Sequence, residues 1–201
     1  MATPVDGARI APEEILTANE VRALISACSA RSSTGLRNRA LIVVLYRSGL
    51  RLGEALQLEA GQVDLESRTV RGATRGERVR SIGLDAGSFR VIERWLERRA
   101  ELGLQADAPL FCTLSGKVLA SSYLRGLLHR LAEKAKVDKQ VSAEVLRRSL
   151  AVELVKEGFP IETIQSQLGH SAASVTGRYL ARLAAADPTV VDVSRRRDWL
   201  A

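Results

Sequence analysis

The chain has 201 residues, of which 46% are hydrophobic and 26% are charged, a balance typical of a folded globular protein and not of a disordered one. Thirty Lys and Arg residues against 23 Asp and Glu give a net charge of +7, which favours a polyanionic partner. The sequence has no run of about 18 apolar residues, and residues 1–10 lack the basic and then apolar pattern of a secretory signal peptide. We therefore expect a cytoplasmic protein without a membrane span.

The chain begins without periodicity and then becomes helical. Residues 1–14 mix Pro, Gly and Asp and are expected to form a flexible arm. Thr17 and Glu20 have the spacing of a capping box, and apolar residues recur on one helix face after them. This pattern predicts a helix over 18–30. Cys28, at its end, is expected to be a buried free thiol, like Cys112, because neither has metal-site spacing.

A buried helix and a small sheet are predicted next. Residues 36–48 are apolar nearly all round and predict a central helix that ends at Gly49. A short helix is expected over 52–58. From 62 to 84, short apolar segments flank a turn at 72–76, which indicates three short antiparallel strands.

The rest of the chain is predicted to be helical. Gly158 and Gly169 are expected to end two of these helices. Candidate residues for helix starts are Asp85, Ser121 or Ser122, Pro160, and Ser171 or Ser174. The fold class is therefore mainly α with a small antiparallel three-stranded sheet (α+β), in one domain over 15–186. The tail 187–201 is expected to be a linker with a segment that docks on this chain or on a neighbour.

Three stretches contain the groups that cleavage of a phosphodiester requires, namely a nucleophile and fixed positive charges. They are Gly49-Leu50-Arg51 followed by Glu54, then Leu146-Arg147-Arg148-Ser149, and Leu168-Gly169-His170-Ser171 followed by Tyr179. Arginine suits this task because its planar fork binds phosphate oxygens in pairs. In order and spacing, these stretches resemble the motifs of tyrosine recombinases of the Xer and phage-integrase type, and the resemblance covers about residues 15–185.

The resemblance implies a role for each motif residue. Arg51 and Arg147 would clamp the scissile phosphate, His170 would form a hydrogen bond to it, and Tyr179 would form a 3′-phosphotyrosine bond. The resemblance also implies double-stranded DNA as substrate, no metal or cofactor, and a homo-tetramer on paired sites. Contacts with DNA are expected from further arginines: Arg71, Arg75, Arg78, Arg80 and Arg148.

Each of these residues also has an ordinary structural explanation. Arg51 can solvate a helix end, His170 can cap a helix after Gly169, and Tyr179 can be a half-buried core residue. The hairpin arginines can equally line a solvated strand edge. Taken together, the structural explanations require that all four motif residues match the family pattern by coincidence. The other tyrosines, Tyr46 and Tyr123, lie in apolar helical patterns and are assigned to the core.

Two positions depart from the family pattern. Ala73 stands where related enzymes carry a lysine that protonates the leaving oxygen, and neither Ala73 nor the nearby Arg75 can supply that proton. Glu144 stands where relatives carry His or Lys. It can accept the tyrosine proton, or it can form an ion pair with Arg147, and we favour the ion pair.

These departures leave two functions open. The first is a site-specific recombinase that cleaves and rejoins DNA, with catalysis weakened by these two changes. The second is a catalytically impaired relative that binds DNA as an accessory factor or regulator. A third reading, a piece of a longer enzyme, follows from the short stretch before the first helix, where relatives carry a DNA-clamping domain.

Overall fold

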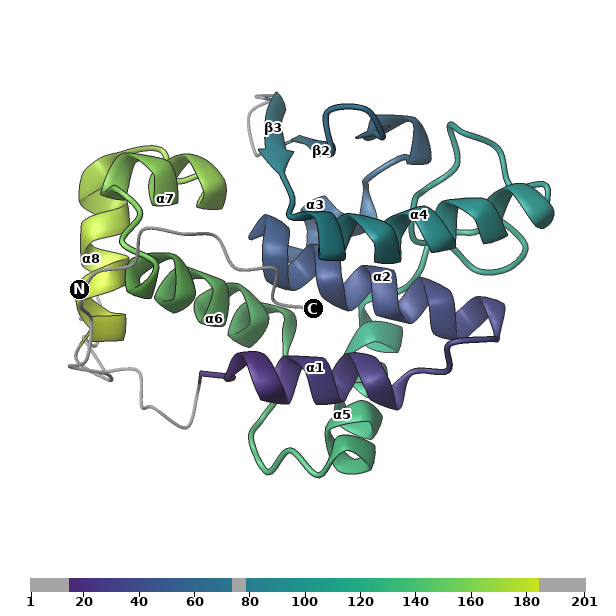
Figure 1. The fold of residues 1–201 in the computed structure, drawn as a ribbon, viewed down its shortest axis with the longest axis horizontal. Coiled ribbons are helices and arrows are strands. Elements are labelled where there is room, and N and C mark those ends of the chain that lie inside the picture. Colours follow the sequence, from purple (N-terminus) through teal and green to yellow (C-terminus); the bar gives the residue numbers. More distant parts are fainter. Residues whose placement is uncertain (1–14, 74–78, 185–201) are drawn as a thin grey trace, which may run out of the picture.

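The computed structural model describes residues 15–73 and 79–184 and is drawn in Figure 1. The proposed arm, the tail 187–201, and both Arg75 and Arg78 lie outside the described residues. The elements are α1 (Ala18–Ala27), α2 (Ser33–Ser48), α3 (Leu52–Leu56), η2 (Ala60–Gln62), β1 (Val63–Asp64), β2 (Thr69–Ala73), β3 (Val79–Gly83), α4 (Ala86–Glu101), α5 (Ser121–Ala135), α6 (Ala143–Lys156), α7 (Ile161–Leu168) and α8 (Ala173–Ala184). The mainly α fold with a three-stranded antiparallel sheet is confirmed.

Helix α2 runs through the middle of the molecule, in contact with α1, α4 and α6 (Figure 1). Most of its residues are buried, as its all-round apolar pattern predicts. Arg47 is also buried, and its charge is balanced by Asp85 at 3.2 Å and Glu153 at 3.0 Å. The helix ends at Gly49 in the left-handed conformation, with φ of 64°.

The sheet has the order β1-β2-β3 and lies at the top of Figure 1, beyond α3. Val70 and Ile82 are direct partners across β2 and β3, and both are buried. Gly72 and Arg80 form the pair two residues closer to the hairpin turn. Because side chains alternate along a strand, the Gly72–Arg80 pair faces the same side as the buried pair.

The helix starts agree only in part with the sequence-based prediction. The capping box of Thr17 and Glu20 is present, and Asp85 accepts a hydrogen bond from the backbone of Ser88. The prediction for α5 is wrong, because Ala120 precedes the helix and no side chain caps it. The prediction for α8 is wrong too: this helix begins at Ala173, after the Ala172 carbonyl has accepted the first backbone hydrogen bonds.

These two helices start without the predicted side-chain caps because a cap contributes little to helix stability. A side-chain cap contributes only about 1 kcal/mol, so packing of the flanking residues can set the first turn without one. Leu119 is 4% exposed, and its burial fixes the chain directly before α5. Cys28 and Cys112 are buried free thiols, as expected.

The C-terminal helices form a second apolar cluster that positions the site. The second half of α6 packs against α7 and α8, and these three helices lie together on the left of Figure 1. Tyr179 and Leu180 of α8 pack against this cluster. Within the part of the chain that the structure describes, no helix combines the length and apolar character that crossing a membrane requires.

Candidate active site

Arg147 of α6 is 2% exposed and connects the ends of two other helices. It donates to the backbone carbonyl of Gly49, which ends α2, and to that of Leu168 at the end of α7, at 2.7 Å. A third hydrogen bond, of 3.2 Å, joins it to Nε2 of His170. These contacts use three of the five N–H groups of the guanidinium, so N–H donors remain for a bound anion.

The prediction of an ion pair between Glu144 and Arg147 is wrong. Glu144 instead lies 3.7 Å from Arg148, one helical turn further along α6. The difference has a physical reason, since Arg147 points into the protein, where carbonyl groups satisfy it, whereas Glu144 is exposed. The charge of Glu144 still acts on the site, because it raises the pKa of Tyr179.

His170 follows the left-handed Gly169 and is held between Arg147 and Thr176. Burial lowers its pKa to about 4, helped by the positive charges of Arg147, Arg51 and Arg80, so the ring is neutral at pH 7. Arginine has no acceptor, so Nε2 of His170 must accept from Arg147. The ring proton is therefore on Nδ1, which donates to the Thr176 hydroxyl at 3.0 Å.

Tyr179 of α8 stands beside this histidine. The two ring centroids are 5.2 Å apart, and the rings meet edge to face. The Tyr179 hydroxyl is buried and has no hydrogen-bond partner of normal geometry among the described residues. Burial raises the pKa of Tyr179, and Glu144 raises it further, while Arg147 and Arg148 act in the opposite direction. The phenol is therefore neutral near pH 7, and its reaction requires a proton acceptor.

The other two tyrosines differ from Tyr179 in this respect. The hydroxyl of Tyr46 donates to Glu153 at 2.5 Å, and Tyr46 is 1% exposed. The hydroxyl of Tyr123 accepts from Arg37 and packs against the core. The assignment of both residues to the core is confirmed. Of the three tyrosines, Tyr179 is the one whose hydroxyl makes no hydrogen bond of normal geometry, although that hydroxyl lies near Arg147.

Arg51 and Arg80 complete the positive cluster. Arg51 precedes α3, its side chain is 47% exposed, and it lies 3.1 Å from Glu54. Arg80 of β3 is 12% exposed and lies 3.6 Å from the same carboxylate. Both arginines lower the pKa of His170, which shows that their charges reach the histidine. The structure thus brings together Arg51, Arg147, His170 and Tyr179 from four separate segments of the chain.

The remaining predicted residues lie around this cluster. Arg71 is exposed on β2, and Arg148 is partly buried in its pair with Glu144. Thr176 was missed by the sequence reasoning, although it stands one helical turn before Tyr179 and therefore on the same face of α8. That spacing is a usable signal, since a hydroxyl at this position can fix the orientation of His170.

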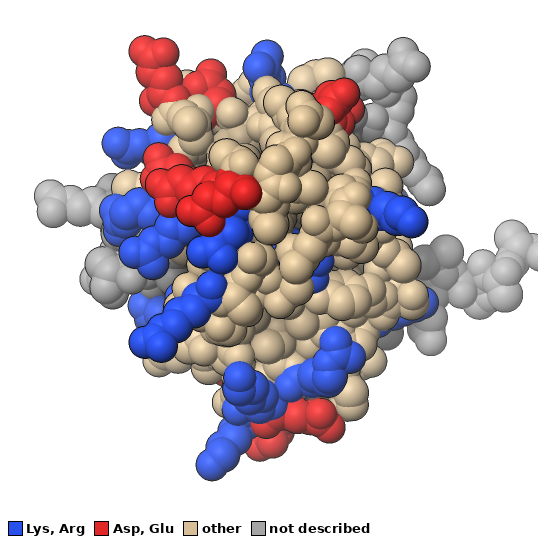
Figure 2. Space-filling model, turned by 90° about the vertical axis from the view of Figure 1, so that its right-hand side faces the viewer, with Lys and Arg blue, Asp and Glu red and all other residues tan. Residues whose placement is uncertain are grey.

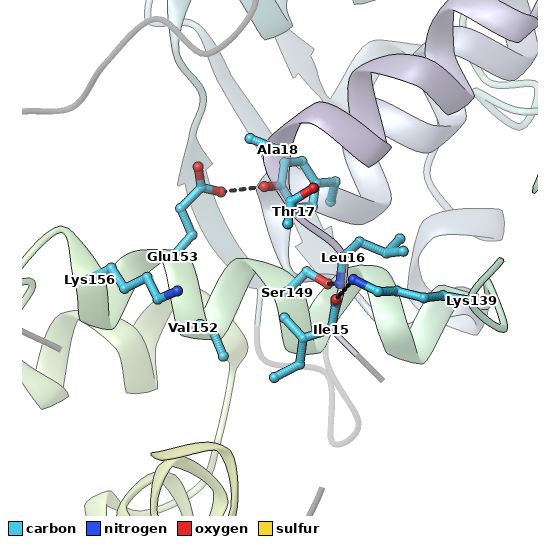
Figure 3. A pocket seen from close by; sticks show the side chains of 10 residues that line it. Ile15, Leu16, Thr17, Ala18, Lys139, Ser149, Val152, Glu153 and Lys156 are labelled. Atoms are coloured by element: carbon cyan, nitrogen blue, oxygen red, sulfur yellow. Dashed lines mark hydrogen bonds between the residues drawn. The ribbon is translucent and has the colours of Figure 1, made fainter. Parts of the chain in front are cut away.

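A pocket of about 530 Å³ lies elsewhere, between the start of α1 and α6 (Figure 3). Its α6 residues include Ser149, Val152 and Glu153, which at helical spacing occupy the face opposite Arg147. None of the four motif residues lines it. In Figure 3, a dashed line joins Glu153 to its hydrogen-bond partner, which is the hydroxyl of Tyr46. Among the described residues, no group of three or more His, Cys, Asp or Glu is placed to hold a metal ion.

Figure 2 shows the side of the molecule that lies on the right of Figure 1, away from α7 and α8. On this face acidic side chains lie among the basic ones, and much of the middle carries no charge. A polyanion therefore finds no uniformly positive surface there. The cluster of Arg51, Arg80 and Arg147 is a stronger candidate for binding an anion.

Comparison with known proteins shows the family of this chain. The phage integrase family model matches residues 14–185. The tyrosine recombinase XerC of Myxococcus xanthus is 33% identical over 171 residues, which cover 83% of this chain and 57% of that protein. XerD of Xanthomonas campestris pv. campestris is 32% identical over 173 residues, covering 82% of this chain and 54% of that protein. The chain thus spans little more than half the length of these relatives.

Solved structures show the same fold. XerH recombinase, in a pre-cleavage complex with its difH substrate, superimposes with a TM-score of 0.71 at 26% identity, over 87% of this chain and 53% of that one. XerA recombinase superimposes with a TM-score of 0.73 at 24% identity, over 85% of this chain and 64% of that one. The chain therefore belongs to the phage integrase family and has the fold of the tyrosine recombinases.

Proposed function

We propose that this protein is a site-specific tyrosine recombinase that cleaves and rejoins double-stranded DNA through Tyr179. The observation that carries the proposal is the buried hydroxyl of Tyr179, which lies near the guanidinium of Arg147 and beside a neutral His170 but makes no hydrogen bond of normal geometry. A nucleophile next to fixed positive charge is what transfer of a phosphoryl group needs without a metal.

In the proposed reaction, the Tyr179 oxygen attacks the phosphorus of a phosphodiester. A bond forms between that oxygen and phosphorus, and the bond to the 5′ oxygen of the next nucleotide breaks. Arg51 and the free N–H groups of Arg147 would stabilise the charge on the non-bridging oxygens. The phenol proton needs an acceptor, and the carboxylate of Glu144 is one candidate. Nε2 of His170 can accept the proton only after its hydrogen bond from Arg147 breaks, because its one lone pair accepts that bond.

The departing 5′ oxygen needs a proton, and Ala73 cannot donate one. This position and Glu144 favour the second candidate function, a relative that binds DNA as an accessory factor or regulator. A general acid typically contributes about 10²- to 10⁴-fold, so its absence slows cleavage without preventing binding.

A covalent adduct separates the two functions. The protein would be incubated with a pool of nicked duplexes of randomised sequence, from which cleavage releases a short strand that cannot rejoin. A recombinase should leave a protein–DNA adduct that survives denaturant, and its DNA can be sequenced to give the site. Binding to duplex DNA without any adduct would support the accessory function.

Three further predictions stay open. We propose that the protein works as a homo-tetramer on paired sites and that the tail 187–201 takes part in the assembly. A mobile genetic element is a fitting context, since the integrase of the Tn1549 transposon has a similar fold, with a TM-score of 0.69. Location in the cytoplasm also stays a prediction.

A further inference from the structure

Arg80 occupies an inward-facing position of the β2–β3 hairpin. It is the direct partner of Gly72, two residues from the buried pair of Val70 and Ile82, so both pairs face the same side. A Cβ atom on Gly72 would lie only 2.7 Å from a methyl carbon of Leu50. This face therefore packs against the protein, and Arg80 points toward the interior and not along a solvated strand edge.

The guanidinium of Arg80 has no hydrogen bond among the described residues. All three of its nitrogen atoms are buried, and its side chain is 12% exposed. Its contact with Glu54 is 3.6 Å long, which exceeds a normal hydrogen-bond distance. Buried donors without partners are costly, and such groups are often kept for a ligand that satisfies them.

The surroundings of Arg80 are positively charged. Burial, together with the charges of Arg147 and Arg51, lowers its pKa to about 10, while Glu54 acts in the opposite direction. Glu54 is the carboxylate in contact with Arg51 and Arg80, so it is shared by two guanidinium groups. Like charges gathered at short range call for an anion between them.

We propose that Arg80 is a third phosphate-binding arginine of this site and donates hydrogen bonds to the scissile phosphate beside Arg51 and Arg147. The inference rests on the proposed recombinase function. The two non-bridging oxygens of a phosphodiester offer enough lone pairs for several guanidinium groups. Ala73, where the family carries a lysine, pairs with Val79, and Arg80 is the next residue of β3. Neighbouring residues of a strand face opposite sides, so Arg80 does not replace the missing lysine but adds a positive charge from the inward face of the hairpin.

Titration with inorganic phosphate tests this without knowledge of the DNA site. The Nε–H signals of ¹⁵N-labelled arginine would be followed by NMR in the wild-type protein and in Arg80→Met, Arg51→Met and Arg130→Met. Arg130 is the matched control, because it is exposed on α5, at the opposite end of the molecule from the hairpin (Figure 1). Phosphate should shift the Arg80 signal, and the first two variants should each bind phosphate about tenfold more weakly than wild type. The control should bind as wild type does.

The possible outcomes separate the inference from the proposed function. One outcome is that Arg51→Met weakens phosphate binding, Arg80→Met does not, and the Arg80 signal stays fixed. Arg80 would then serve only as a partner of the Glu54 carboxylate. The inference would be wrong, while the proposed recombinase site would stand. If neither variant changes phosphate binding, both the inference about Arg80 and the proposed phosphate site of the recombinase are contradicted. Should Arg80→Met fail to fold, Arg80→Lys would replace it, because lysine keeps the positive charge but lacks the planar pair of N–H donors. The shift of the wild-type Arg80 signal with phosphate would still show whether Arg80 binds phosphate.

Discussion

Tyr179 lies where opposing electrostatic effects meet. Burial and Glu144 favour the neutral phenol, while Arg147 and Arg148 favour the phenolate. In the described state burial dominates, and the hydroxyl keeps its proton. Binding of DNA would add a negatively charged phosphate next to the arginines, and this charge disfavours the phenolate. Activation of the tyrosine therefore depends on transfer of its proton to a neighbouring group.

The protonation of His170 is directly measurable. Its pKa in the folded protein is about 4, below the usual value near 6.5 for an unfolded chain. The unfolded state therefore binds the extra proton first, and folding stability should fall as the pH drops from about 6.5 to about 4. An NMR titration of the His170 ring should give a midpoint near 4. In His170→Gln, this part of the acid destabilisation should disappear from urea unfolding curves, and an unchanged pH dependence would contradict the assignment.

The missing acid at Ala73 leads to another prediction. A DNA substrate with sulfur in place of the 5′ bridging oxygen needs no proton to leave, because a thiolate is stable near neutral pH. The wild-type protein should cleave this substrate far faster than ordinary DNA. Ala73→Lys should raise cleavage of ordinary DNA by about 10²-fold, measured as adduct on a denaturing gel. Equal rates on both substrates, with no gain from the lysine, would mean that another residue supplies the proton.

At the scale of elements, the ends of helices build the site. Gly49 ends α2 with φ of 64°, and its carbonyl accepts from Arg147, while Leu168 does the same at the end of α7. Gly169 then turns the chain so that His170 meets Arg147. The geometry of the candidate site therefore depends on two left-handed glycines as much as on the motif residues.

Substitution of Gly49 tests this dependence. Gly49→Ala forces a left-handed alanine and puts its Cβ 3.0 Å from Leu168 and 3.1 Å from Leu150. We expect a loss of about 3 kcal/mol in the free energy of unfolding, from backbone strain and overpacking together. Gly103→Ala is the control, because Gly103 has φ of 68° and open space around it. It should lose only about 1–2 kcal/mol in urea unfolding. Equal losses in the two variants would show that Gly49 has no special packing role.

The order of elements could be predicted from the sequence because periodicity is local. The all-round apolar α2, the capping box at Thr17 and the three strands followed from neighbouring residues alone. The starts of α5 and α8 could not, since tertiary packing sets them. The motif residues could be identified by resemblance, but the partners of Arg147 are backbone carbonyls that carry no sequence signal. The inward orientation of Arg80 depends on strand register, which the sequence of the hairpin left open.

At the scale of the whole molecule, a net charge of +7 does not make every face positive. The face in Figure 2 is mixed, whereas the positive charges of Arg51, Arg80 and Arg147 all act on His170. Binding to duplex DNA should therefore depend on contacts with phosphates around the site. Salt should weaken such binding steeply, because each neutralised phosphate releases counterions.

This salt dependence can be put in numbers. Each phosphate contact should lower the affinity roughly 3.5-fold for a fourfold rise in salt, so five contacts give roughly a 500-fold loss. Fluorescence anisotropy with a labelled duplex would measure the slope. Arg71→Ala removes an exposed positive charge from β2 and should reduce the slope by about one unit. An affinity that does not change with salt would contradict binding through phosphates.

The most direct test of the account is the identity of the residue that becomes linked to DNA. A trapped adduct would be digested with protease and nuclease, and the modified peptide would be sequenced by mass spectrometry. We expect a phosphate-linked Tyr179. We also expect Tyr179→Phe to bind DNA as wild type does but to form no adduct, because only the nucleophilic oxygen is lost. A modification on Tyr46 or Tyr123, or an adduct that persists in Tyr179→Phe, would contradict the central claim.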